Sequence, residues 1–417
     1  MSSNIADALR RGPQATAHLV RTHEMYPHVK SGELTLRKSQ AAVLHRRSTM
    51  SIYNSATIPS SGFASACFAD IPLTGADVIA GVTLRITYLN STGAQLNQWK
   101  ARWAWYLLDH VDVLAQNGST VLERIEPEHL IKAWIELPRE AHERVREGLQ
   151  GGPENAGGNP TAVNNGQSAT IYYPLLSCGL ATQEIPPFAL AAPIILRVYF
   201  RGSAVFTGGP YAAQMIPNGP PTITAFDAVI SAYQLDVSER NDIARRYAMA
   251  GLRSSPLDIR MARPGFQRTQ ETFAGAGSLH TIRLSSVQGL VTSMTVLIQK
   301  PDATGFGFGL YYTPERVDLV DEKGSSLYGQ PLDYGLLQVT QMATDGVVND
   351  IQTNRVLALP IGGTSGEAAG QIHGYVPMSG HHQLRIECQA GDYTVTIIYR
   401  TVAHMRVERA HLTVHSS

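Results

Sequence analysis

The chain has 417 residues, of which 43% are hydrophobic and 16% are charged, and its formal net charge is zero. This length exceeds what one hydrophobic core usually serves, so we expect two domains of comparable size. The low charged fraction indicates surface that is buried between subunits, and the balanced charge excludes an overall basic field for nucleic acid. No 18-residue apolar run and no signal-peptide core is found, so we expect neither a spanning helix nor secretion by that route.

The N-terminal segment carries an excess of positive charge. Residues 1–47 hold eight Lys and Arg residues against three Asp and Glu residues, a net charge of +5. Short helices are expected at Asn4–Arg11 and Ala15–Met25, split by Gly12-Pro13, and neither is long enough to be stable alone. We expect this arm to become ordered only against another surface.

From about residue 50 onward, short β-like runs alternate with Gly, Pro, Asn and Asp. Asn-Gly pairs at 117–118, 165–166 and 218–219 readily adopt the positive φ values of tight turns. The pattern predicts an all-β fold of sandwiches or barrels. The clearest runs are Val78–Leu89, Tyr106–Ala115, Ile194–Phe200, Ile223–Val237, His280–Leu284, Leu290–Lys300 and Tyr393–Val407.

Helical patterns interrupt the β runs at two places. Apolar residues fall on one face of Glu128–Leu137, and a polar helix follows to Leu149. Between the two β regions, Ser238 is the predicted cap of a helix that stops by Gly251, and we interpret this helix as the connector between domains. The Gly-, Asn- and Pro-rich stretch Gly151–Gln167 predicts a mobile surface loop.

Three internal similarities occur in the same order in the two halves of the chain. We interpret them as a duplicated β-domain, although all-β chains share strand-turn-strand patterns in any case. The pairs are Val111–Leu122 with Val317–Tyr328, Leu196–Val198 with Leu384–Ile386, and Ser231–Val237 with Thr401–Val407.

Across residues 50–410, the spacing of hydrophobic runs resembles that of double jelly-roll major capsid proteins of tailless icosahedral double-stranded DNA viruses. The similarity rests on Gly75–Leu89, Leu107–Gly118, Leu130–Leu137 with Trp134, Ile171–Leu176, Pro187–Phe200, Ala232–Arg240, Thr281–Val296 and Tyr393–Val407.

The resemblance implies an all-β chain of two tandem eight-stranded jelly-roll barrels with short inserted and connecting helices. The implied domains are a basic arm at 1–48, a first jelly roll at 49–238, a connector helix and linker at 239–261, and a second jelly roll at 262–417. The implied function is structural and not enzymatic, with no cofactor: homotrimers form pseudo-hexagonal capsomers that tile an icosahedral shell over an internal membrane.

Partners and location are also implied by the resemblance. The chain is expected to contact itself, neighbouring capsomers, and minor capsid and penton proteins, with no sequence-specific nucleic acid. It is expected in the virion shell after synthesis in the host cytoplasm. Family members place the N-terminal arm inward against a membrane, which gives a candidate membrane- or interior-facing set: Arg10, Arg11, Arg21, Lys30, Arg37 and Lys38.

A tandem jelly roll is also the fold of bicupin metalloenzymes, so the histidines need a test. Cupins bind iron or manganese through a close His-x-His pair and a downstream Glu, and none of the 14 histidines supplies such a pair. Adjacent His381 and His382 point to opposite faces of a strand, and we expect a solvated turn there. The five-residue steps between His18, His23 and His28 place them on different faces of a helix.

Asp109, His110 and Asp112 are the nearest approach to an acid–base group. Strand alternation predicts His110 and Asp112 on one face and Asp109 on the other, as solvated strand-end residues. No G-x-S-x-G, P-loop or H-E-x-x-H motif is present. The sequence therefore predicts no catalytic, cofactor-binding or metal-binding residue.

Two further residue types bear on alternative functions. Cys67, Cys178 and Cys388 are far apart, which argues against a disulfide framework or zinc site and favours a reducing compartment. Tryptophans at 99, 103, 105 and 134 are predicted to pack in the core, although exposed aromatic rings would bind sugars. A non-viral β-sandwich carbohydrate-binding module and a bicupin-type metalloenzyme are therefore the alternatives.

Overall fold

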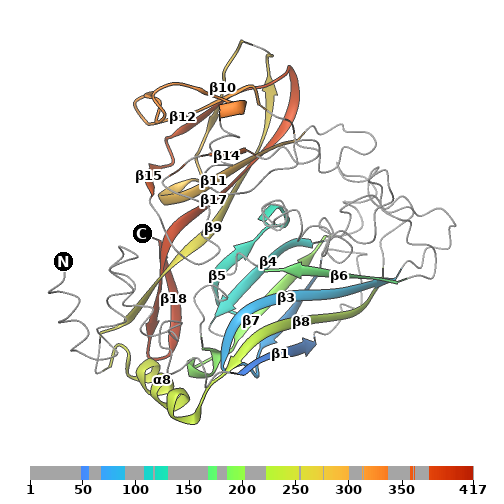
Figure 1. The fold of residues 1–417 in the computed structure, drawn as a ribbon, viewed down its shortest axis with the longest axis vertical. Helices are drawn as coiled ribbons and strands as arrows, with labels where there is room; N and C mark the ends of the chain where they lie inside the picture. Colours follow the sequence, from blue (N-terminus) through green and yellow to red (C-terminus); the bar gives the residue numbers. More distant parts are fainter. Residues whose placement is uncertain are drawn as a thin grey trace, which may run out of the picture.

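The computed structural model describes two β-barrels and one connecting helix (Figure 1). The residues that it describes are 48–55, 67–89, 108–115, 118–129, 168–175, 186–201, 222–252, 255–275, 277–299, 312, 314–336, 357–359, 361 and 375–416. The predicted N-terminal helices, most of the predicted helices at 128–149 and the loop at 151–167 lie outside these residues.

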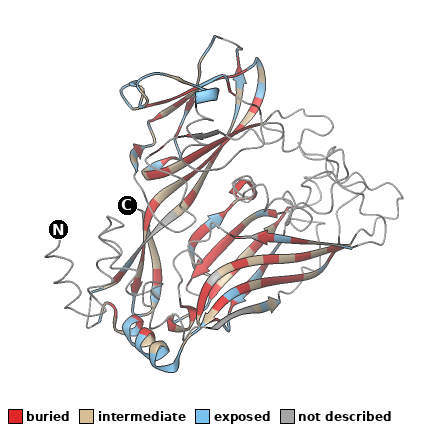
Figure 2. Ribbon diagram, in the orientation of Figure 1, coloured by how far each residue is buried: buried red, intermediate tan, exposed pale blue. Residues whose placement is uncertain are grey.

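The first barrel consists of two four-stranded antiparallel sheets. One sheet has the order β1-β8-β3-β6 and the other has the order β2-β7-β4-β5. Buried and partly exposed residues alternate strictly along β7, because one face of each sheet meets the other sheet (Figure 2). The strands are β1 Ser48–Ser55, β2 Cys67–Leu73, β3 Val78–Leu89, β4 Leu108–Ala115, β5 Thr120–Ile125, β6 Ser168–Pro174, β7 Ile194–Phe200 and β8 Thr222–Gln234.

The second barrel repeats this strand order. Its sheets run β9-β17-β11-β14 and β10-β16-β12-β13, and β15 and β18 are added as further strands beside β11 and β17. The strands are β9 Leu257–Phe273, β10 His280–Arg283, β11 Gln288–Gln299, β12 Arg316–Val320, β13 Leu332–Asp333, β14 Leu357–Leu359, β15 Val376–Ser379, β16 Gln383–Glu387, β17 Gly391–Glu408 and β18 His411–Ser416.

Strand order in each barrel is that of a jelly roll, so the predicted fold of two tandem eight-stranded jelly rolls is confirmed. The internal similarities fall on equivalent strands: β4 with β12, β7 with β16, and β8 with β17. The turn after β4 is tight as predicted, since Gly118 has φ of +86° and donates its N–H to Ala115 O at 3.1 Å. In the second barrel, the matching turn is closed in the same way, since Gly324 has φ of +85° and donates its N–H to Asp321 O at 3.1 Å.

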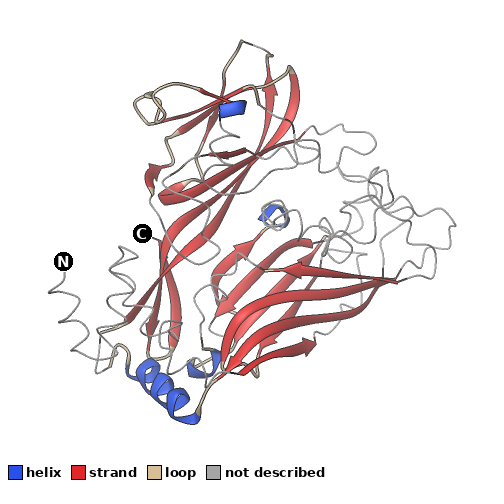
Figure 3. Ribbon diagram, viewed as in Figure 1, coloured by secondary structure: helices blue, strands red, loops and turns tan. Residues whose placement is uncertain are grey.

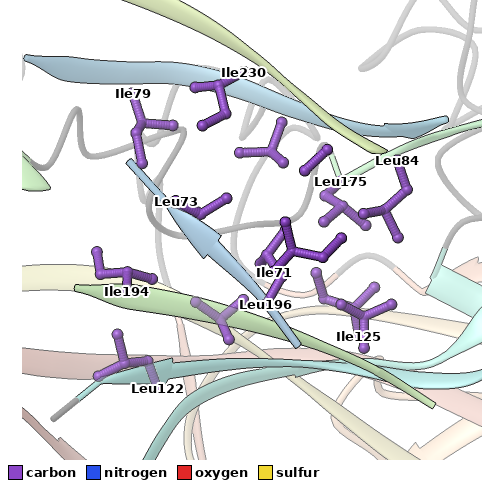
Figure 4. Packing of buried hydrophobic residues seen from close by; sticks show 14 of the residues in the cluster. Ile71, Leu73, Ile79, Leu84, Leu122, Ile125, Leu175, Ile194, Leu196 and Ile230 are labelled. Atoms are coloured by element: carbon purple, nitrogen blue, oxygen red, sulfur yellow. The ribbon is translucent and has the colours of Figure 1, made fainter. Parts of the chain in front are cut away.

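Each barrel has its own apolar core. In the first barrel, residues such as Ile71, Leu84, Leu196 and Ile230 pack between the two sheets (Figure 4). A second core includes Val317 and other residues of the second barrel. The predicted boundaries of the four domains stay a prediction, and β9 begins at Leu257, inside the range predicted as the linker.

Helix α8, Val237–Met249, connects the barrels as predicted (Figure 3). Its N-cap is Asp236 and not Ser238, so the predicted cap is wrong by two residues. The hydroxyl of Ser238 donates instead to the carboxylate of Asp236 at 2.7 Å. The helix ends at Met249 with Ala250 as its C-cap, and the following Gly251 has a positive φ of +75° that favours glycine.

Strands β9, β17 and β18 extend beyond the second barrel and lie along the first (Figure 1). Met405, Val407 and Leu412 from this three-stranded ribbon belong to the first core. The turn between β17 and β18 is held on α8, because Arg409 N–H donates to Ala250 O at 2.8 Å. Two long strands therefore join the barrels in addition to the connector helix.

Candidate functional site

The acid–histidine group lies on the outer face of β4. His110 Nδ1 is 2.9 Å from Asp109 Oδ2, and His110 Nε2 is 3.7 Å from Asp112 Oδ2. The predicted separation of Asp109 from His110 is wrong, because the pairing of β4 with β7 shifts register between Leu108 and His110. The predicted solvation is also wrong for Asp112, which is only 2% exposed.

Arginines already neutralise both carboxylates of this group. Arg124 donates to the two oxygens of Asp112 at 2.7 and 2.9 Å, and Arg201 Nε is 3.4 Å from Asp109 Oδ1. The hydrogen bond from His110 holds the pKa of Asp109 below its usual value. Because both carboxylates pair with cations, the group forms a charge-balanced network on the outer face of β4.

The outer face of sheet β2-β7-β4-β5 carries a row of alternating charges. Asp70, Arg197, Asp112 and Arg124 occupy one position on each of the four strands in turn. Arg197 donates to both oxygens of Asp70, at 2.7 and 2.8 Å, and its guanidinium lies 4.8 Å from the centre of the Phe68 ring. This row makes the face ordered and electrically balanced.

The second barrel repeats the central pair of this row. Asp318 on β12 lies opposite Arg385 on β16, as Asp112 lies opposite Arg197 in the first barrel. A further pair joins Arg316 Nε to Glu387 Oε2 at 2.5 Å across the same two strands. The duplicated fold therefore includes a duplicated polar outer face.

Where the barrels meet, charged residues are buried. Arg268 on β9 contacts the carboxylate of Glu128, which follows β5 and has a side chain only 8% exposed. The guanidinium of Arg268 also lies 5.1 Å from the centre of the Phe266 ring. Burial raises the pKa of nearby Glu126. This contact fixes one barrel against the other through a charge-assisted hydrogen bond.

Histidine placement gives no support for the bicupin alternative. Among the described residues, no group of three or more His, Cys, Asp or Glu side chains is arranged to hold a metal ion. His381 is exposed as predicted for a solvated turn, but His382 is only 6% exposed, so that prediction is wrong for His382. Its carbonyl accepts the Leu284 N–H at 3.0 Å, which ties the turn to the second barrel.

Several predicted residues lie outside the part of the chain that the structure describes. They are the basic set Arg10, Arg11, Arg21, Lys30, Arg37 and Lys38, the four tryptophans, His18, His23, His28 and Cys178. Cys67 and Cys388 are described, Cys67 as half-buried and Cys388 as buried. Of the helices that the structure describes, none is long and apolar enough to cross a membrane.

Comparison with known proteins identifies the fold of this chain through solved structures. No family model and no curated protein matches the sequence. Solved structures do match: the protein in a quasi-atomic model of the PBCV-1 virus capsid aligns with a TM-score of 0.65 at 12% identity, over 89% of this chain and 97% of that one.

Two other viral proteins match in the same way. The Faustovirus major capsid protein aligns with a TM-score of 0.64 at 8% identity, over 87% of this chain and 91% of its own. The STIV major capsid protein aligns with a TM-score of 0.52 at 14% identity, over 85% of this chain and 96% of its own. This chain is a double jelly roll. The predicted resemblance to double jelly-roll capsid proteins is confirmed at the level of the fold.

The double jelly roll carries two features that the sequence did not single out. The internal similarities contain a signal for the row of alternating charges. Asp112 aligns with Asp318, and Arg197 aligns with Arg385, in the paired segments of the two halves. The contact of Glu128 with Arg268 left no such signal, because 140 residues separate the partners and no motif links them.

Proposed function

We propose that this double jelly roll is a major capsid protein, a structural protein of the virion. The observation that carries the proposal is the complete duplication of the jelly-roll strand order in one chain, matched by viral capsid proteins over at least 85% of its length. A fold is compatible with several functions, so the proposal also needs a physical reason why this architecture suits a shell.

Shape supplies that reason. Three copies of a subunit with two similar barrels form a block with six corners, and such blocks tile a flat facet. Closed three-fold symmetry stops open-ended growth within each block. Barrels also leave few free sheet edges, so a protein made in many copies avoids random edge pairing. We therefore propose homotrimeric, pseudo-hexagonal capsomers that tile an icosahedral shell.

Its proposed partners follow from the shell. They are further copies of the chain, neighbouring capsomers, and minor capsid and penton proteins, with assembly into virions after synthesis in the host cytoplasm. The N-terminal arm, with its net charge of +5, is proposed to face an internal membrane, since basic residues are attracted to anionic lipid. No sequence-specific contact with nucleic acid is proposed.

An enzyme and a sugar-binding module are supported less well. The carboxylates beside His110 are held by Arg124 and Arg201, which favours a structural role. Phe68 is 53% exposed, but the guanidinium of Arg197 lies over its ring and limits its use as a platform for a sugar. A structural, non-catalytic role is therefore proposed.

Oligomer mass tests the proposal. Light scattering on the purified protein is expected to give three times 45.3 kDa, about 136 kDa. A stable monomer would contradict the capsid role and favour the binding module. Metal analysis of the same sample tests the alternative of a bicupin-type metalloenzyme, because stoichiometric iron or manganese would support it.

A further inference from the structure

The sheets β1-β8-β3-β6 and β9-β17-β11-β14 occupy equivalent places in the two barrels. A register shift interrupts the pairing of β3 with β8 between Ile79 and Gly81, and the pairing of β11 with β17 between Val291 and Ser293. Because such a shift marks one position in a sheet, the two shifts align the strands residue by residue. The outer faces of the two sheets can therefore be compared position by position.

One row of side chains has the same chemistry on both outer faces. Each row crosses three strands and consists of an aromatic ring, a β-branched aliphatic side chain and a threonine. The Tyr53 row is Tyr53, Val229 and Thr83, and the Phe266 row is Phe266, Ile398 and Thr295. An arginine guanidinium lies 5.1 Å from the centre of each aromatic ring, Arg85 at Tyr53 and Arg268 at Phe266.

The two rows differ in what covers them. In the second barrel, Ile398 is 1% exposed and Thr295 is 2% exposed. Ile398 belongs to the apolar cluster of the first barrel, and Phe266 packs against that cluster. In the first barrel, by contrast, Tyr53 is 57% exposed. The same kind of surface is therefore an internal contact in the second barrel and open surface in the first.

The first barrel contacts the Phe266 row through the short helical segment that follows β5. The ring of His129 in this segment lies 6.4 Å from the ring of Phe266, centre to centre. The preceding Glu128 contacts Arg268, two residues along β9 from Phe266. This segment is therefore the part of the first barrel that recognises the outer face of the second.

The second barrel has an equivalent segment after β13. Val111 on β4 pairs with Ile125 on β5, and Val317, its counterpart in the internal similarity, pairs with Leu332 on β13. Helical residues begin two positions further along in both barrels, at 127 and at 334. Position 129 is therefore equivalent to Leu336, an apolar side chain that is 48% exposed.

We propose that Leu336 of one chain packs on the Tyr53 row of a second chain, as His129 packs on the Phe266 row within one chain. The contact buries two exposed apolar side chains against each other. It joins two different surfaces, so it continues from chain to chain until the rotation closes a ring. Closure at three chains, with six similar contacts between barrels, rests on the homotrimer proposed above, whereas the contact itself requires only a second copy.

Cross-linking of the full chain with a short bismaleimide tests this contact. Strand β1 and strand β12, the partner of β13, lie at opposite ends of the molecule (Figure 1), so a link between Tyr53→Cys and Leu336→Cys joins two chains. We expect denaturing gels to show linked chains, up to three, with a yield about tenfold or more above that of the control pair Val121→Cys and Leu336→Cys. Val121 is a matched control because it is 38% exposed and lies on β5 of the opposite sheet. The single variants measure links through the native cysteines.

A charge placed in the contact provides a second measurement. Tyr53→Asp and Leu336→Asp are each expected to lower the mass from light scattering threefold, to 45.3 kDa, because a carboxylate is costly to bury in an apolar contact. Phe68→Asp is the matched control, since Phe68 is aromatic, 53% exposed and on the opposite sheet, and it should leave the mass unchanged. Circular dichroism is expected to show all three variants folded, because each replaced side chain is exposed.

Failure of this contact is distinguishable from failure of the capsid proposal. A trimeric wild type with equal cross-linking of the two cysteine pairs would overturn the contact alone, as would trimers that persist in both Asp variants. Linked chains from Tyr53→Cys and Leu336→Cys in a protein that is not a trimer would support the contact and contradict the capsomer. A monomeric wild type would overturn both.

Discussion

Arg268 and Glu128 form an ion pair across the contact between the two barrels. Arg268 lies on β9 of the second barrel, and Glu128 follows β5, an edge strand of the sheet β2-β7-β4-β5 in the first barrel. Since the Glu128 side chain is buried, loss of its cation leaves a carboxylate without charge compensation. The pair therefore links the barrels energetically as well as geometrically.

Arg268→Gln is expected to lower the free energy of unfolding by about 2 kcal/mol, less than for a fully buried pair because Arg268 is 34% exposed. Urea denaturation measures the change. Arg406→Gln is the matched control on the same ribbon, since its pair with Asp258 is exposed on both sides and should contribute less than about 1 kcal/mol. Equal losses in the two variants would show that the contact between barrels has no special role.

The hydroxyls of Tyr88 and Tyr173 are 2.9 Å apart inside the first barrel, and both side chains are fully buried. Tyr88→Phe is expected to cost about 1–3 kcal/mol, because it removes one member of a buried hydrogen bond. The double variant with Tyr173→Phe should cost less than the sum of the two single changes. A double-mutant cycle from denaturation curves checks this, and simple additivity would contradict a direct bond.

Alkaline pH should unfold the protein through the same tyrosines. Burial raises the pKa of Tyr88 and Tyr173 above the ordinary value, so the folded state keeps both protons after unfolded tyrosines begin to ionise near pH 10. The stability is therefore present below about pH 10 and is lost as pH rises further. A pH titration followed by phenolate absorbance and by circular dichroism checks this. Ionisation of Tyr88 and Tyr173 should coincide with the loss of the circular dichroism signal of the folded state.

Gly265 on β9 lies opposite Tyr399 on β17, and the tyrosine ring occupies the space where a Cβ would stand. The hydroxyl of Tyr399 donates to Ser286 O at 2.6 Å, which holds the ring in place. Gly265→Ala is expected to destabilise the second barrel by about 1–3 kcal/mol. Gly81→Ala is the matched control, because its Cβ would meet Ser231 at an ordinary 3.8 Å. Thermal unfolding compares the two, and equal melting temperatures would contradict the steric argument.

The charge of the N-terminal arm predicts salt-sensitive binding to anionic lipid. Deleting residues 1–40 is expected to leave trimers intact and to weaken binding to anionic liposomes, at about 1 kcal/mol for each basic residue near the surface. Co-sedimentation at low and high salt measures this, with neutral liposomes as the control. Unchanged binding after the deletion would remove the membrane role of the arm.

Hydrophobic periodicity in the sequence was sufficient to predict the bounds of strands in which buried and exposed residues alternate. Ile194–Phe200 was predicted with the bounds that β7 has, because every second residue faces the core. Val78–Leu89 likewise matches β3. The cap of α8 was missed because Asp236 and Ser238 are both good N-cap residues, and only the backbone geometry decides between them.

For the acid–histidine group, alternation correctly predicted that His110 and Asp112 lie together, but it wrongly separated Asp109 from His110. The extra residue in β4 between Leu108 and His110 appears only when β4 is paired with β7. A register shift depends on the partner strand, and the partner lies far along the chain, so no local pattern records it.

The sequence by itself determined the all-β class, the duplication and the connecting helix, because hydrophobic periodicity and helix-end residues act over a few positions. Only the tertiary structure decided the contact of Arg268 with Glu128 and the burial of His382. Each of these depends on which distant segments meet, and pairing of distant strands is set by the packing of the whole chain and not by neighbouring residues.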